Sequence, residues 1–275
     1  MAGEETRRKS GRQRRRARVD IQVGFVSHEG QRRGHNEDSA ALVDLEVPGA
    51  GLKMWLCAIA DGAGGMASGD LASRLTIEAV KRSLQDQVAA SAHPAPGESY
   101  GEWLASAVQE ANTLVYRRSQ HEQTRMASTL VVALVEGQRI HIANVGDSRA
   151  YLVRAAGLQR ITRDHSAVQE LLNAGLITKE QAERHPFEHI LTRAIGPEPH
   201  VEPDLFTERV HPGDRVLLCS DGLTNMVAED DIWQMVREAV NPQAAAQALV
   251  DAANQAGGKD NITAVVIEVC NASPV

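Results

Sequence analysis

The order of its apolar runs and helical segments is the feature that most restricts what this chain can fold into. Apolar runs of strand length lie at residues 21–27, 39–45, 52–60, 129–135, 139–145, 151–153, 158–161, 190–195, 201–210, 216–219 and 262–270. Helical spacing of apolar residues covers two pairs of segments, 70–90 with 100–120 and 229–240 with 242–256. Because these helix pairs are set between strand runs, without regular strand–helix alternation, the sequence predicts an α+β sandwich in one domain, with sheets inside and helices outside.

Glycines mark two of the connections in this pattern. Gly137 and Gln138 separate two strand runs, which predicts a two-residue hairpin with glycine leading. Between about residues 165 and 185, two short helical segments are separated at Gly175.

The composition excludes several classes of protein. Apolar residues make up 43% and charged residues 24% of the 275 positions, which is typical of globular proteins and not of disordered chains. No apolar run approaches the roughly 18 residues of a membrane span, and the first residues contain no apolar segment typical of secretory signals. Cys57, Cys219 and Cys270 are isolated within apolar runs. They predict buried free thiols in a reducing compartment and argue against a disulfide framework or a thiolate zinc site.

The first 18 residues form a basic arm on an otherwise acidic chain. They contain eight Lys or Arg residues and two Glu, although the whole chain has a net charge of −7. A basic arm can bind RNA or anionic lipid, but this one has neither aromatic residues for base stacking nor an apolar face. We therefore expect residues 1–18 to be a solvated, disordered arm and residues 19–272 to form the folded domain. We expect no binding to nucleic acid or to a membrane.

Carboxylates stand at the edges of the apolar strand runs. The set consists of Glu37, Asp38, Asp61, Asp147, Asp221 and Asp260. A single Asp-Gly at a strand end is usually a turn, but six buried neighbouring carboxylates repel one another unless a cation compensates them. Oxygen ligands without Cys or His favour Mg²⁺ or Mn²⁺, and two such ions can share a carboxylate and activate a water molecule. The pattern predicts a hydrated binuclear metal centre at strand ends.

Six short motifs, five of which contain these carboxylates, follow one another along the chain. They are Arg33-Gly34-His35-Asn36-Glu37-Asp38, Asp61-Gly62-Ala63-Gly64-Gly65, Ala127-Ser128-Thr129-Leu130, Gly146-Asp147-Ser148-Arg149, Ser220-Asp221-Gly222-Leu223 and Lys259-Asp260-Asn261. In this order they resemble the metal-dependent serine/threonine protein phosphatases (PPM, or type 2C), over about residues 20–270. The bacterial branch is resembled by the stretch from Asp164-His165-Ser166 through His185-Pro186 and by Leu191-Thr192-Arg193-Ala194-Ile195-Gly196. The resemblance implies an αββα sandwich, in which helix pairs flank two antiparallel sheets and the metal ions lie at one end.

The resemblance also implies roles for the first four residues of the site. Asp61 would bridge both ions, and the carbonyl oxygen of Gly62 would bind one of them. Glu37 would serve the second ion, directly or through water, and Asp38 would orient metal-bound water.

The remaining site residues follow from the same resemblance. Asp221 and Asp260 would complete the shell of the first ion, and Asp147 would help to hold a third, weaker ion. Arg33 matches the arginine that grips the substrate phosphate, which suits a planar fork of donors, and Arg32 is the adjacent alternative.

In the implied mechanism, a hydroxide that bridges the two ions attacks phosphorus in line, and no cysteine nucleophile is needed. Relatives often carry a histidine within or just after the Asp-Gly-x-Gly-Gly loop as a candidate general acid, whereas this chain has Ala63 and Met66 there. His35 and His165 are the nearest histidines in the motifs, and the sequence leaves open whether either is catalytic or structural. Residues 163–195 correspond to the flap of bacterial relatives, a short and polar lid.

Together these inferences predict a cytoplasmic, monomeric enzyme that hydrolyses phosphoserine and phosphothreonine in proteins and opposes a bacterial serine/threonine kinase. It would bind two Mg²⁺ or Mn²⁺ ions and could bind a third. The alternative is a catalytically weak pseudophosphatase that acts as a binding module, which loss of a metal-binding aspartate would have indicated.

Overall fold

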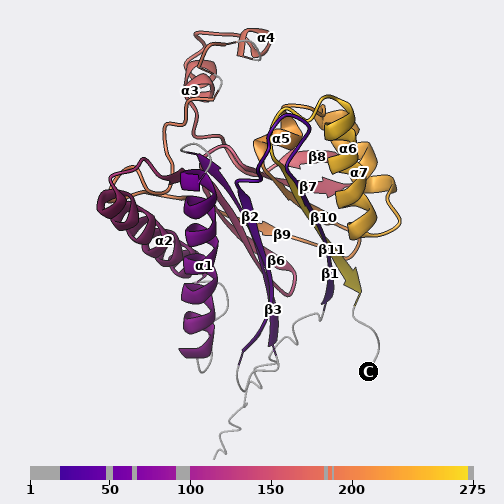
Figure 1. Ribbon diagram of the computed structural model, residues 1–275. Coiled ribbons are helices and arrows are strands. Elements are labelled where there is room, and N and C mark those ends of the chain that lie inside the picture. The colour runs from indigo at the N-terminus through magenta and orange to yellow at the C-terminus, as the bar shows by residue number, and fades with distance from the viewer. Residues whose placement is uncertain are drawn as a thin grey trace, which may run out of the picture.

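Two antiparallel sheets lie face to face at the centre of the computed structural model, which describes residues 19–47, 52–63, 67–90, 100–182, 185–187 and 189–271 (Figure 1). The first sheet, ordered β1-β11-β10-β7-β8, contains β1 (Val19–His28), β7 (Arg149–Arg154), β8 (Gly157–Arg160), β10 (Arg215–Cys219) and β11 (Ile262–Asn271). The second, ordered β2-β3-β5-β6-β9 with β4 paired to β3, contains β2 (Asp38–Val47), β3 (Leu52–Ala63), β4 (Ala127–Ser128), β5 (Leu130–Glu136), β6 (Arg139–Val145) and β9 (Asp204–Arg209).

A pair of helices covers the outer face of each sheet (Figure 1). On the second sheet pack α1 (Ala67–Ala90) and α2 (Tyr100–Glu122), and on the first pack α6 (Glu229–Glu238) and α7 (Pro242–Gln255). The predicted α+β sandwich, with two antiparallel sheets flanked by helix pairs, is confirmed.

The two-residue period of the strands sorts apolar side chains into separate layers. On β3, Leu56 and Ala58 pack with the residues of α1 and α2, whereas Cys57 and Ile59 pack in the layer between the sheets. Both faces of this strand are therefore buried, which explains why it reads as a continuous apolar run. Cys57 and Cys219 are buried free thiols as expected, but Cys270 is only partly buried.

Two short helices, α3 (Ala167–Asn173) and α4 (Lys179–Ala182), lie between β8 and β9 in the sequence and project away from the sandwich (Figure 1). The side chain of Ser166 caps α3 by accepting a hydrogen bond from the backbone N–H of Gln169. Gly175 follows α3 with a φ of 68°, in the left-handed region that glycine adopts without a steric penalty.

One strand prediction in this part of the chain was wrong, and another was too long. The run at 190–195 forms no strand, because Leu191 and Ile195 make only isolated bridges, to Ser166 and Ser128. These residues do not take part in a ladder: Ile195 is fully buried, whereas Ile190 is half-exposed. The run at 201–210 is a strand only over Asp204–Arg209.

None of the described helices combines the length and apolar character that a membrane crossing requires. The basic arm at residues 1–18 and Met66 lie outside the described residues.

Candidate active site

The ends of strands from both sheets bring the predicted carboxylates together. The register of β2 and β3 places Asp38 directly opposite Asp61. Asp221 follows β10 as the first residue of a short helix that the sequence pattern did not indicate, α5 (Asp221–Thr224), and Asp260 precedes β11. Together with Glu37 and Asp147, these residues form one electrostatically coupled group, which we call the acidic cluster.

Burial and mutual repulsion make the charged forms of these carboxyl groups unfavourable. Burial raises the pKa of Asp38 to about 7 and that of Asp147 to about 8, and in both cases the charge of Asp221 adds to the effect. The pKa of Asp61 lies well above its usual range, because burial and then Asp38 and Asp221 disfavour its charge. Burial also raises the pKa of Glu37. A nearby cation would reverse these effects by stabilising the carboxylates.

Three carboxylate oxygens of the acidic cluster are buried without a hydrogen-bond partner. They are Glu37 Oε1, Asp38 Oδ1 and Asp221 Oδ1. A buried carboxylate oxygen without a hydrogen-bond partner costs free energy, and such oxygens are the ligands that hard divalent cations prefer. Among the described residues, no three His, Cys, Asp or Glu side chains form a ready-made ligand cage. Ions that bind here would therefore complete their shells with water and backbone oxygens, so the donor set fits hydrated Mg²⁺ or Mn²⁺.

The backbone around Asp61 and Gly62 is tightly held. The N–H of Asp61 donates to Thr129 Oγ1 at 3.0 Å, and its carbonyl oxygen accepts from the Ser128 hydroxyl at 3.1 Å. A Cβ atom at Gly62 would lie 2.1 Å from the carbonyl oxygen of Gly69, so only glycine fits this approach of β3 to the start of α1.

Asn261 fixes the loop that carries Glu37. Its Oδ1 accepts a hydrogen bond from the backbone N–H of Glu37 at 2.8 Å, and its Nδ2 donates to the carbonyl oxygens of Glu29 and His35. Sequence reasoning gave no role to Asn261, although it belongs to the motif that contains Asp260. A polar residue next to a candidate ligand was the signal that could have identified it.

Arg33 lies at the edge of the acidic cluster. Its Nη2 is 2.9 Å from Asp260 Oδ2, and 52% of its side-chain surface is exposed. This side chain can therefore contact both the cluster and a molecule that approaches from solvent. The side chain of Arg32 is exposed.

The two candidate histidines differ in their surroundings. His165 is buried, and its Nδ1 accepts from the backbone N–H of Gly146, so the proton resides on Nε2, which lies 3.3 Å from Asp204 Oδ2. These contacts favour a structural role in the turn that precedes Asp147. His35 is 54% exposed, with Nε2 3.5 Å from Asp70 Oδ2.

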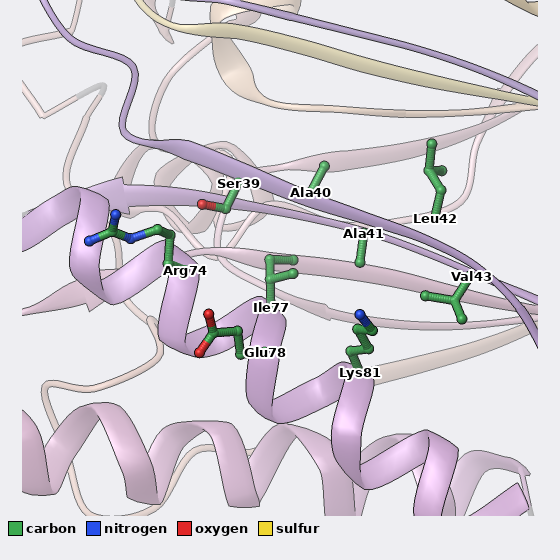
Figure 2. Close-up of a pocket in the computed structure, with 9 residues that line it drawn as sticks. All are labelled: Ser39, Ala40, Ala41, Leu42, Val43, Arg74, Ile77, Glu78 and Lys81. Atoms are coloured by element: carbon green, nitrogen blue, oxygen red, sulfur yellow. The ribbon is translucent and has the colours of Figure 1, made fainter.

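A groove of about 430 Å³ lies beside the acidic cluster and does not contain it. It is lined by residues of β2 and α1, and Figure 2 shows Ser39 at one end and Val43 and Lys81 toward the other. Ser39 directly follows Asp38 in the sequence. None of the six carboxylates lines this groove.

Comparisons with known proteins agree with this fold and identify its family. The chain matches the family described as Protein phosphatase 2C over residues 32–255. It is 37% identical over 246 residues to the serine/threonine phosphatase Stp of Listeria innocua, covering 89% of this chain and 94% of that protein. It is 35% identical over 251 residues to the protein phosphatase PhpP of Streptococcus pneumoniae, covering 90% and 98%.

Two solved structures of bacterial serine/threonine phosphatases have the same fold as this chain. The serine/threonine phosphatase PstP/Ppp of Mycobacterium tuberculosis is similar, with a TM-score of 0.79 and 34% identity over 91% of this chain and 98% of that one. The catalytic domain of PstP in complex with two manganese ions has a TM-score of 0.77 and 33% identity, covering 92% and 99%.

Proposed function

This chain belongs to the protein phosphatase 2C family and is a protein serine/threonine phosphatase, and we propose that its acidic cluster is the centre at which phosphoserine and phosphothreonine are hydrolysed. The observation that carries this proposal is the convergence of three buried, unpartnered carboxylate oxygens beside a half-exposed arginine. Such a set of groups can bind two cations and a phosphoryl group, whereas a structural turn would not require unpartnered carboxylate oxygens.

We assign the ion-binding roles as follows. Asp61, which is close to four other carboxylates of the cluster, would bridge two Mg²⁺ or Mn²⁺ ions, and the Gly62 carbonyl would bind one of them. Glu37 would serve one ion. Asp221 and Asp260 would hold the other. The manganese complex of PstP supports two-ion dependence in a relative of the same fold.

Asp147 would help to hold a third ion. Burial and the charge of Asp221 raise its pKa, and a cation bound nearby would offset both effects by stabilising the charged carboxylate. Asp147 directly follows Gly146, whose φ of 102° lies in the left-handed region that favours glycine.

The bound ions would supply charge neutralisation and a water molecule of lowered pKa. Asp38 would orient that water through Oδ1, the oxygen that no protein group occupies. Arg33 would hold the phosphoryl oxygens with its planar fork of donors. As the water oxygen bonds to phosphorus, the bond between phosphorus and the Ser or Thr oxygen breaks. The water gives up one proton and the leaving oxygen takes up one, so the products are inorganic phosphate and the free hydroxyl. Of the two candidate histidines, only His35 has an exposed side chain from which a proton could reach a substrate.

The substrates would be phosphoproteins, because the enzyme class acts on phosphorylated Ser and Thr side chains. We further propose that the protein opposes a serine/threonine kinase and acts as a monomer in the cytoplasm. The buried free thiols of Cys57 and Cys219 suit a reducing compartment.

Hydrolysis of a phosphothreonine peptide with Mn²⁺, with Mg²⁺ and with EDTA tests this function. We expect turnover with either ion and none with EDTA. A protein that binds Mn²⁺ and the peptide but releases no phosphate would instead be a pseudophosphatase, a binding module that keeps the fold.

A further inference from the structure

A chain of hydrogen bonds, buried where it meets Asp38, holds the oxygen of the Asp38 carboxylate that is not the unpartnered one. Asp38 Oδ2 accepts hydrogen bonds from the Thr263 hydroxyl at 2.6 Å and from the Ser220 hydroxyl at 2.8 Å. The other oxygen, Oδ1, is buried without a partner. Thr263 and Ser220 are themselves fully buried, so water does not compete for these contacts.

The direction of each hydrogen bond in this chain follows from the number of available protons. Asn36 Nδ2 can only donate, and it donates to Ser27 Oγ at 2.9 Å. Thr263 Oγ1 uses its single proton on Asp38, so across the 2.8 Å contact between Ser27 Oγ and Thr263 Oγ1 the proton must come from Ser27. The chain therefore runs one way, from Asn36 through Ser27 and Thr263 to Asp38.

Two backbone contacts close this network. Asn36 Oδ1 accepts from the backbone N–H of Asp38 at 3.1 Å, so the same residue contacts both the main chain and, through two hydroxyls, the side chain of Asp38. Ser220 Oγ accepts from the backbone N–H of Thr263 at 3.0 Å, which leaves its proton for Asp38. Every hydroxyl proton in the network thus has one acceptor.

The network spans the two sheets. Ser27 and Thr263 are a directly opposed pair on β1 and β11, and Ser220 follows β10, all in the first sheet. Asp38 is the first residue of β2 in the second sheet. The terminal torsion of a carboxylate is soft, so its partners and not its rotamer decide which oxygen faces the reaction.

We propose that Ser27, Thr263 and Ser220 are positioning residues for the phosphatase reaction, because their one-way hydrogen bonds hold Oδ2 of Asp38 and reserve Oδ1 for the attacking water. This inference rests on the proposed role of Asp38 as the residue that orients water. It assigns a function to Ser27, which lies outside the recognised motifs. Loss of a hydrogen bond that positions a residue of a metal site typically lowers activity about 10- to 100-fold.

Paired variants of Thr263 in the full-length protein test this assignment. Thr263→Val keeps the side-chain shape but removes the hydroxyl, and we expect kcat on a phosphothreonine peptide to fall about 10- to 100-fold with KM changed less than about threefold. Thr263→Ser keeps the hydroxyl and should recover most of kcat. Calorimetric Mn²⁺ titration should give similar dissociation constants for both variants and the unaltered protein, because neither variant changes a residue that we assign to either of the two ions.

Ser27→Ala is the second test, since it removes a proton donor one step farther from Asp38. We expect a smaller loss of kcat, again with unaltered Mn²⁺ affinity, and this result stands even if Thr263→Val fails to fold in a thermal melt. Ser73→Ala is the matched control: its buried hydroxyl contacts Ser39 Oγ at 2.9 Å outside the network, so kcat should be retained.

Three results would overturn the assignment. These are normal kcat in both Thr263→Val and Ser27→Ala, a Thr263→Ser loss as large as that of Thr263→Val, or Mn²⁺ affinity that falls in parallel with kcat. If the unaltered protein shows no Mn²⁺-dependent turnover, the proposed function fails instead, which distinguishes the two failures.

Discussion

Arg33 and Asp260 form an ion pair in which Nη2 of the guanidinium lies 2.9 Å from Oδ2 of the carboxylate. The residue that we assign to phosphate is thus in direct contact with a residue that we assign to an ion. The other oxygen of Asp260 accepts a hydrogen bond from the backbone N–H of Asn261 at 2.9 Å. Both oxygens therefore already have partners, and an ion that binds Asp260 would share the carboxylate with Arg33.

Arg33→Ala should separate phosphate binding from ion binding. We expect kcat/KM on a phosphopeptide to fall roughly 10- to 100-fold, because one charge-assisted hydrogen bond to phosphate contributes about 1.5–3 kcal/mol. Mn²⁺ affinity, measured by calorimetry, should not weaken, because Asp260 loses a competing cation.

Two further variants complete this test. Arg32→Ala is the matched control and should retain kcat/KM, and a loss there instead of at Arg33 would shift the phosphate-binding role by one residue. Asp260→Ala should weaken Mn²⁺ binding, with activity partly restored by added Mn²⁺. Loss of Mn²⁺ affinity in Arg33→Ala would contradict our assignment.

Asp61→Asn should abolish Mn²⁺-dependent turnover while the fold survives. Asp61 would bridge both ions, and its neutral replacement relieves repulsion from Asp38 and Asp221 in the metal-free protein. Steady-state kinetics and a thermal melt measure the two effects. Asp44→Asn is the control, since Asp44 is an exposed carboxylate on the same sheet. Near-normal turnover of Asp61→Asn would rule out a bridging role.

Without metal, the stability of the protein should fall as pH rises from 5 to 8. The pKa of Asp38 is raised to about 7 from 3.8, so in this window the folded state keeps a proton that the unfolded state has released. Raising the pH then lowers the free energy of unfolding. His141 and His165 have lowered pKa values and act in the opposite direction at the acidic end, so a reference variant is needed.

Asp38→Asn provides that reference, because it keeps the histidines and removes the titrating carboxyl group. In EDTA, its melting temperature relative to the unaltered protein should rise between pH 5 and pH 8. Added Mn²⁺ should stabilise the unaltered protein more at pH 8 than at pH 5, since binding requires the charged carboxylates. A constant difference between the two proteins across this range would show that burial of Asp38 does not disfavour its charge.

A truncated chain that begins at Val19 should keep full activity on a small phosphopeptide. Val19 starts β1, which pairs with β11 from Val19 opposite Asn271 to His28 opposite Ile262, so the truncation leaves this ladder complete. Kinetics and a thermal melt check the outcome. A folded but inactive truncated protein would mean that the basic arm contributes to the site.

The sequence alone determined the type and order of most elements, because apolar spacing reports locally which face of a strand or helix is buried. The hairpin at Gly137 and Gln138 was predicted correctly, since β5 ends at Glu136 and β6 begins at Arg139. The run at 190–195 was misread because apolar content does not reveal whether a neighbouring strand is present to form a ladder.

Tertiary structure alone decided how the site residues meet. Thr263 and Asp38 are 225 residues apart in sequence, and Arg33 and Asp260 are 227 apart. Contacts of this kind depend on strand register and on the stacking of one sheet on the other, which single-residue periodicity does not encode. The sequence thus indicated which carboxylates stand at strand ends, whereas the fold decided that hydroxyls of one sheet hold a carboxylate of the other.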